Sequence, residues 1–174
     1  MDKKTMNEVL SWIEVIVVAF VIAFLIRGFI FEPITVNGDS MIPTLHNGDD
    51  LIVFKLPYRF SPPKYGDIIV FKYPSDPRYH YIKRVIGLPG DSIEIKDGEV
   101  YVNGKKLIEP YINEKTLMDF KLDKVPDDTV FVLGDNRNWS RDSRYPDVGP
   151  VPFKNIIGKA TIRIWPLNKF GLLR

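Results

Sequence analysis

Two side chains far apart in the chain, Ser40 and Lys83, could together carry out hydrolysis. A serine hydroxyl is a poor nucleophile near neutral pH and needs a neighbouring base. A lysine amine can act as that base where burial lowers its pKa by several units, because desolvation disfavours the charged ammonium. If the two side chains meet, the sequence predicts a serine-lysine hydrolase.

The surroundings of Lys83 favour a desolvated amine. Lys83 lies in the middle of the strand-like run from Tyr81 to Ile86, and alternation along a strand places it on the same face as Tyr81 and Val85. Arg84 belongs to the other face, and its guanidinium stays protonated, so it cannot be the base. The pattern alone also fits a lysine at a sheet edge or on a solvated face.

Ser40 lies in a run with the composition of a tight turn. Gly38 allows a close approach of backbone to a bound ligand, and Pro43 stiffens the exit from the turn. Backbone N–H groups of such a turn could hold an oxyanion. Asn-Gly-Asp-Ser is also ordinary turn composition, so Ser40 as a simple turn residue remains the alternative.

A dense polar cluster runs from Gly134 to Arg144, directly after an apolar strand-like run. In a solvated loop such a cluster would have no special meaning. Beside an active site, it would supply carboxylate–guanidinium pairs and a hydroxyl group to orient the lysine amine.

A serine-histidine site is the chemical alternative, with His46 or His80 as the base for Ser40 and an aspartate in support. Alternation places His80 on the strand face of Ile82, opposite Lys83, which argues against both bases serving one site. Triads are recognised by geometry, so the sequence leaves this alternative open.

Composition argues against several other kinds of site. The chain has 174 residues with no cysteine and two histidines, which excludes disulfides, thiol nucleophiles and thiolate metal sites. A histidine-based metal site would need carboxylate help, and neither a metal nor another cofactor is predicted. The net charge is +2 with both signs mixed along the chain, and without a basic stripe no nucleic-acid partner is expected.

The elements that must position these residues begin with an apolar segment, Trp12 to Phe31. Its uncharged centre, Val15 to Ile26, lies between Glu14 and Arg27, whose side chains can reach the lipid headgroups, and about twenty residues suffice to cross a bilayer. A buried core helix and the apolar part of a cleavable signal peptide are the alternatives, although no small-x-small cleavage site follows. We therefore predict a retained transmembrane anchor over residues 12–31.

Lys3 and Lys4 precede this anchor, and the positive-inside tendency predicts that residues 1–11 are cytoplasmic. Residues 32–174 are then expected on the extracytoplasmic face. The chain is predicted to be a single-pass protein of the cell membrane, with the lipid bilayer as one partner.

From residue 32 onward the sequence predicts a mostly β catalytic domain built on an antiparallel sheet. Short runs rich in β-branched and aromatic residues recur between Gly and Pro clusters, and the proline-rich stretch from Leu56 to Tyr65 is predicted to be a loop. The predicted strands are Asp50–Phe54, Asp67–Phe71, Tyr81–Ile86, Thr129–Leu133 and Ile156–Ile164.

Two consecutive hairpins are predicted between Ser92 and Leu107. The pairs Asp97-Gly98 and Asn103-Gly104 divide three alternating runs and have the turn chemistry that two-residue hairpin loops need. We expect residues 92–128 to form a small hairpin-containing subdomain of the β domain.

Three long motifs, in this order after an N-terminal anchor, closely resemble those of bacterial type I signal peptidases. The compact length is similar to that of the single-anchor members typical of Gram-positive bacteria. The motifs are GDSMIPTL at 38–45, KRVIGLPGD at 83–91, and GDNR at 134–137 with Ser140, Asp142, Ser143 and Arg144.

The resemblance implies a membrane-anchored serine endopeptidase that removes signal peptides from exported preproteins after small residues at positions −3 and −1. Ser40 would be the nucleophile and Lys83 the general base, and Ser140 would hydrogen-bond to the lysine amine and position it. The oxyanion would bind the backbone N–H of Ser40, and Gly38 stands where some members add a hydroxyl group. The supporting charge network would comprise Asp135, Asp142, Arg84 and Arg144.

The resemblance also implies that an extended substrate lies along the chain before Ser40 and before Lys83, pairing as an added strand. Shallow apolar pockets there would accept the small residues. The residues expected to bind the substrate are Ile34, Val36, Gly38, Asp39, Met41, Tyr81 and Ile82.

Two other functions remain open. A serine-lysine self-cleaving regulator would have a similar catalytic fold, but it normally carries a DNA-binding region where this chain has an apolar segment. A catalytically inactive, membrane-tethered β module would only bind peptides, and the presence of both Ser40 and Lys83 argues against it.

Overall fold

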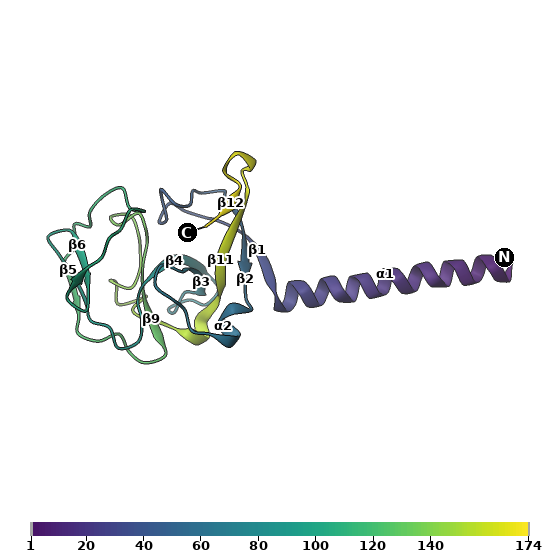
Figure 1. Ribbon diagram of the computed structural model, residues 1–174, viewed down its shortest axis with the longest axis horizontal. Helices are drawn as coiled ribbons and strands as arrows, with labels where there is room; N and C mark the ends of the chain where they lie inside the picture. The colour runs from purple at the N-terminus through teal and green to yellow at the C-terminus, as the bar shows by residue number, and fades with distance from the viewer. Residues whose placement is uncertain (1, 174) are drawn as a thin grey trace.

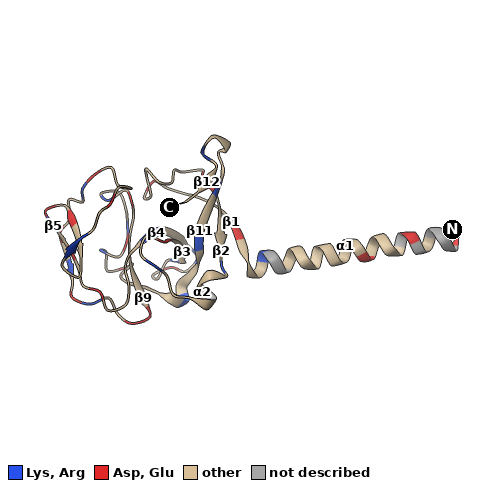
Figure 2. Ribbon diagram, in the orientation of Figure 1, with Lys and Arg blue, Asp and Glu red and all other residues tan. Residues whose placement is uncertain are grey.

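A long N-terminal helix leads into two antiparallel sheets in the computed structural model, which describes residues 2–173 (Figure 1). The helix, α1 (Lys3–Phe29), projects away from the sheets. Its stretch Leu10–Phe29 has a mean hydropathy of 2.3 and none of it is buried, so it is long and apolar enough to cross a membrane. The sequence has no charged residue between Glu14 and Arg27, and Figure 2 shows a long uncharged stretch in the described part of this helix. The expected apolar helix ahead of a mostly β structure is confirmed, and the alternative of a buried core helix is wrong.

The helix begins before residue 12 and ends before residue 31, the bounds predicted for the anchor, whose extent in the membrane stays a prediction. The helix begins at Lys3 instead of Trp12, because the polar N-terminal residues contain no helix breaker. It ends at Phe29 because Phe31 already pairs with Phe54 of the next strand, with ring centroids 6.3 Å apart.

The larger sheet contains eight strands and carries the polar motifs at its centre. All its pairings are antiparallel, as predicted. Its order is β1 (Phe31–Thr35), β2 (Asp50–Phe54), β11 (Ile156–Trp165), β3 (Ile68–Lys72), β4 (His80–Gly87), β9 (Thr129–Leu133) and β10 (Val151–Pro152), with β12 (Gly171–Leu172) on β11.

The smaller sheet contains the two predicted hairpins. Asp97, Gly98, Asn103 and Gly104 all have positive φ, as two-residue hairpin loops of this type require. The order of its strands is β7 (Lys105–Lys106), β6 (Glu99–Val102), β5 (Ile93–Lys96) and β8 (Phe120–Leu122).

Buried apolar clusters hold the turn with Ser40 and the smaller sheet against the larger one. Val36, Met41 and Leu45, on either side of Ser40, pack with Leu51, Val53 and Ile68. On the other side, a cluster from β4, β9 and the smaller sheet is formed by Ile86, Phe131, Leu133, Ile93, Ile95 and Val100. The two sheets therefore share one continuous apolar boundary at β4 and β9.

Several short elements were missing from the sequence prediction. The stretch 56–65 is not entirely loop, because α2 (Pro57–Phe60) forms one helical turn that starts at a proline, a residue favoured there. The structure adds the short strands β8, β10 and β12 and the 3₁₀ turns η1 (Phe153–Asn155) and η2 (Leu167–Lys169). Strands of two or three residues leave too little periodicity to be recognised in a sequence.

Gly158 is a point where the backbones of β11 and β2 come too close for a side chain. A Cβ at Gly158 would lie 2.4 Å from the carbonyl oxygen of Phe54. We expect Gly158→Ala to lower the free energy of unfolding by about 2 kcal/mol or more, because β2 must move. The matched control is Gly171→Ala, where no atom lies within 4 Å of the added carbon. Equal denaturation midpoints for the two variants would contradict this prediction.

Candidate active site

Ser40 lies on the turn between β1 and β2, and backbone hydrogen bonds join the two ends of this turn. The backbone bonds from Val36 N to Asp49 O (2.8 Å) and from Gly48 N to Val36 O (2.9 Å) close the turn. Gly38 adopts a φ of 105°, and its N–H donates to the side-chain oxygen of Asn47 at 3.0 Å. The positive φ explains the glycine at this position, since other residues are strained there.

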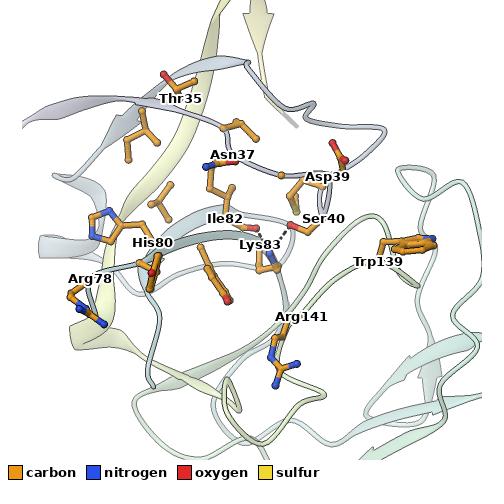
Figure 3. Close-up of a pocket in the computed structure, with 17 residues that line it drawn as sticks. Thr35, Asn37, Asp39, Ser40, Arg78, His80, Ile82, Lys83, Trp139 and Arg141 are labelled. Carbon is orange, nitrogen blue, oxygen red and sulfur yellow. Dashed lines mark hydrogen bonds between the residues drawn. The ribbon is translucent and has the colours of Figure 1, made fainter. Parts of the chain in front are cut away.

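Lys83 of β4 meets Ser40 directly. Its Nζ donates to the Oγ of Ser40 at 2.7 Å and to the carbonyl oxygen of Ile82 at 2.9 Å (Figure 3). The same nitrogen lies 5.1 Å from the ring centroid of Tyr81, its neighbour on the strand face. Only 4% of Lys83 is exposed, so the amine is in the desolvated setting that strand alternation suggested.

This burial lowers the pKa of Lys83 from 10.5 to about 8. Desolvation is the largest cause, and the negative charges of Asp142 and Asp135 partly oppose it. A substantial share of the amine is therefore neutral near pH 8, which is the form that can accept a proton from a serine hydroxyl.

Asp135 connects β4 to the Ser40 turn through a buried network. Arg84, on the strand face opposite Lys83, makes two bonds to Asp135 at 2.9 and 2.7 Å. Thr44 donates its hydroxyl to the same carboxylate at 2.5 Å. The guanidinium of Arg84 also lies 4.0 Å from the ring centroid of Tyr111.

Asp142 and Arg144 fix the polar loop that follows β9. Arg144 binds Asp142 at 2.8 and 2.9 Å, and Asp142 accepts the backbone N–H of Gly134 at 3.0 Å. Arg144 also donates to Thr116 at 2.7 Å and to the carbonyl oxygen of Arg137 at 2.6 Å. The four charged residues predicted for the network thus form two buried ion pairs, Arg84–Asp135 and Arg144–Asp142.

Ser140 does not make the hydrogen bond that the resemblance implied. Its Oγ is buried without a hydrogen-bond partner among the described residues, because Lys83 Nζ is directed to Ser40 and Ile82. The hydroxyl nevertheless lies close to the dyad. A Cβ on Gly134 would lie 2.2 Å from Ser140 Oγ and 2.4 Å from the carbonyl oxygen of Ser40. Because Gly134 has no side chain, the hydroxyl of Ser140 and the backbone of Ser40 can both lie against the end of β9.

All seven residues predicted to bind substrate line one cleft of about 530 Å³ together with Ser40 and Lys83. The cleft runs between the chain around β1 and the start of β4 (Figure 3). Its apolar wall includes Val70 in addition to the predicted residues, and further polar lining comes from Asn37, Arg78, His80 and Arg141. The binding roles of the seven stay predictions.

The histidines are placed differently from Lys83. His80 lines the cleft, whereas Nδ1 of His46 is buried without a hydrogen-bond partner among the described residues. Within residues 2–173, no recorded hydrogen bond joins either histidine to Ser40. No set of three or more His, Cys, Asp or Glu side chains in that range is grouped to hold a metal ion.

This arrangement has relatives among known proteins. The family model for signal peptidase, peptidase S26, matches residues 9–165. Signal peptidase I of Bacillus licheniformis is 41% identical over 173 residues, which cover 94% of this chain and 92% of that protein. Probable signal peptidase I-1 of Synechocystis is 45% identical over 168 residues, which cover 92% of this chain and 85% of that protein. The chain belongs to the signal peptidase family, peptidase S26.

A solved member of the signal peptidase family supports the fold as well. The crystal structure of a signal peptidase I from Enterococcus faecalis has a TM-score of 0.53 with this chain at 36% identity, covering 58% of this chain and 98% of that one. The resemblance inferred from the three motifs is therefore confirmed at the level of family and fold.

Sequence reasoning missed the contribution of residues 109–116 to this signal peptidase site. Glu109 accepts two bonds from Arg137 at 3.0 and 2.6 Å, and Arg137 donates to the carbonyl oxygen of Gly134 at 3.0 Å. Tyr111 and Thr116 contact the arginines of the two other ion pairs. These residues carry no motif of their own, and only the packing of the smaller sheet brings them to the site.

Burial of the Lys83 amine lowers the free energy of unfolding, and replacing the lysine with an uncharged residue should restore part of it. Lowering its pKa from 10.5 to about 8 corresponds to about 3 kcal/mol of destabilisation, which is fully present below pH 8 and fades as the pH rises toward 10.5. A methionine at position 83 has no charge to desolvate, but it cannot make the hydrogen bonds of Lys83 to Ser40 and Ile82. The first effect is larger than the second, so we expect Lys83→Met to raise the free energy of unfolding by about 1–2 kcal/mol at pH 7.

The measurement is chemical denaturation of both proteins at pH 7 and at pH 10. The gain should shrink at the higher pH, because the wild-type amine is then neutral in the folded state. A gain that is absent at pH 7, or equal at both pH values, would contradict the assignment of desolvation as the main cause.

Proposed function

We propose that this chain is a membrane-anchored endopeptidase that cleaves signal peptides from exported preproteins with Ser40 as nucleophile and Lys83 as general base. The observation that carries the proposal is the 2.7 Å contact between Lys83 Nζ and Ser40 Oγ, which is within reach for direct proton transfer. The lowered pKa of Lys83 gives the amine the protonation state that this role needs. Membership of the signal peptidase family supports the substrate class.

In the first step, neutral Lys83 takes the proton of the Ser40 hydroxyl as Oγ attacks the carbonyl carbon at the cut. The tetrahedral intermediate carries a negative oxygen, for which we propose the backbone N–H of Ser40 as donor. Gly38 cannot add a side-chain donor, and its own N–H is bonded to Asn47. Collapse of the intermediate breaks the C–N bond, and the Lys83 ammonium returns its proton to the departing amine.

In the second step, water replaces the departed amine. Lys83, neutral again, removes a proton from this water as its oxygen attacks the ester that joins Ser40 to the signal peptide. The ester breaks, Ser40 regains its proton from Lys83, and the signal peptide leaves with a free carboxylate. Ser140, Asp142 and Arg144 would act through the loop that surrounds the dyad, as positioning residues.

The strand pairing around Lys83 explains how an extended substrate would lie in the cleft. β4 pairs with β3 along His80 to Arg84, but its pairing with β9 covers only Arg84 to Gly87. The other edge of residues 80–83 is therefore not covered by β9 and faces the cleft. A peptide could add there as a strand opposite residues 34–36.

The same placement supports a requirement for small residues at −3 and −1. Side chains two apart in an extended peptide point to the same side, so both would enter the apolar wall. That wall is formed by Ile34, Val36, Met41, Val70 and Ile82.

We also propose that α1 holds the sheets at the outer face of the cell membrane, with the bilayer as a partner. Lys3 and Lys4 at the start of α1 favour a cytoplasmic N-terminus. A preprotein whose apolar signal segment is inserted in the same bilayer would then meet the cleft at high effective concentration.

Ser40→Ala is expected to abolish cleavage of a preprotein in detergent or in vesicles, because the nucleophilic oxygen is lost. The matched control is Ser61→Ala, in an exposed turn outside the cleft, which should retain wild-type cleavage. Lys83→Arg should also be nearly inactive, since arginine does not deprotonate. Folding is checked by circular dichroism. Cleavage by the Ser40 variant at the wild-type rate would refute the mechanism.

The pH profile should show one ionisation set by Lys83. Only the neutral amine is active, so kcat/KM should rise about tenfold per pH unit at acid pH and level off above about pH 8. Replacing His46 and His80 with glutamine should leave this limb in place. A limb that disappears with the histidines would identify a histidine base instead.

A further inference from the structure

Trp139 is a large aromatic side chain exposed at one end of the cleft. Its side chain lines the cleft that contains Ser40 and Lys83, yet the residue is 79% exposed. Figure 3 shows it beyond the dyad, on the side away from Arg78 and His80. Exposed tryptophans are common at binding surfaces, because the ring buries a large area and has few rotamers to lose.

The backbone around Trp139 is held in a fixed relation to the nucleophile. Its N–H donates to the carbonyl oxygen of Asn136 at 3.0 Å, and the N–H of Asn136 donates to the carbonyl oxygen of Ser40 at 3.0 Å. The side chain of Asn138 bonds to Leu117 N at 2.9 Å and to Lys115 O at 3.1 Å. The indole is thus exposed on a loop that is held by hydrogen bonds to the Ser40 turn and to residues 115–117.

A second, smaller cavity lies against Trp139. It has a volume of about 240 Å³ and is lined by Ile42, Asn113, Glu114, Asn136 and others. Trp139 lines both the cleft and this second cavity, so the two adjoin at its side chain. Leu117, which bonds to Asn138, is 89% exposed and adds apolar surface on this side. The surface beyond the dyad therefore continues the cleft.

The direction of the bound chain follows from the proposed function, on which this inference rests. Residues before the cut lie between 34–36 and 80–82, so the residues after the cut must leave past Ser40 toward Trp139. An extended chain advances about 3.3 Å per residue, so only a few residues lie beside a side chain at the end of the cleft.

We propose that Trp139 binds the first two or three residues of the mature chain, on the carboxyl side of the cut, and favours apolar side chains there. The indole ring covers apolar side chains at the second or third of these positions and excludes water from them. Since the contact is present before and during the reaction, it lowers KM more than it raises kcat.

The test uses two fluorogenic peptides with the same residues before the cut and the full-length protein in detergent. One peptide has leucine at the second and third positions after the cut, and the other has serine at both. We expect the wild type to prefer the leucine peptide by about tenfold in kcat/KM, chiefly through KM. In Trp139→Ala this ratio should fall to near one, and in Trp139→Phe it should be largely kept.

Trp165→Ala is the matched control, because Trp165 is also an exposed tryptophan but is not among the residues of either cavity. It should keep the wild-type ratio. A wild type that cleaves both peptides equally would overturn the inference, as would a Trp139→Ala ratio that stays at the wild-type value. A fall in kcat alone would instead show that Trp139 acts through its neighbour Ser140, and would also overturn it.

Failure of the proposed function gives a different result. In that case the wild type would cleave neither peptide, or Ser40→Ala would cleave both. A binding measurement adds a second readout: the uncut leucine peptide should shift the tryptophan fluorescence of Ser40→Ala. The shift should be lost in Ser40→Ala/Trp139→Phe, and a shift that persists there would overturn the inference.

Discussion

The contact between the Lys83 amine and the Ser40 hydroxyl requires a lysine to be buried without an adjacent counter-ion. An amine in this setting is poorly solvated, and the carboxylates of Asp142 and Asp135 act on it only at a distance, each already bonded to an arginine. The surrounding structure must therefore hold the amine in place. Strand β4 does this through pairing with β3, and the apolar cluster beneath the Ser40 turn holds the other partner.

The buried ion pairs explain how irregular backbone can be held accurately beside this dyad. Buried pairs contribute little net stability, because desolvation offsets their attraction, but a pair with several hydrogen bonds permits few geometries. Arg84–Asp135 connects β4 to the Ser40 turn, and Arg144–Asp142 holds the start of the loop at Gly134. The pairs thus fix the loop that contains Ser140 and Trp139 against the nucleophile.

The position of the cleft suits a substrate that is itself delivered in a membrane. Helix α1 leads directly into β1, and β1 leads into the turn that carries Ser40. A small number of residues therefore separates the apolar helix from the proposed nucleophile. Under the proposed function, this short connection keeps the cleft near the bilayer surface, where the end of an inserted signal segment would lie.

Local pattern was enough to predict the apolar helix, the longer strands and both hairpins, because spacing along the chain decides which side chains share a face and which turns can form. It also placed Lys83 and Arg84 on opposite faces of one strand. It could not predict that the amine of Lys83 would contact Ser40 and leave Ser140 Oγ without a partner, nor that Glu109 and Thr116 would reach the site. Those contacts join segments distant in sequence, so only the tertiary structure decided them: the Ser40 turn packs on the larger sheet, and the smaller sheet carries residues 109–116 to the site.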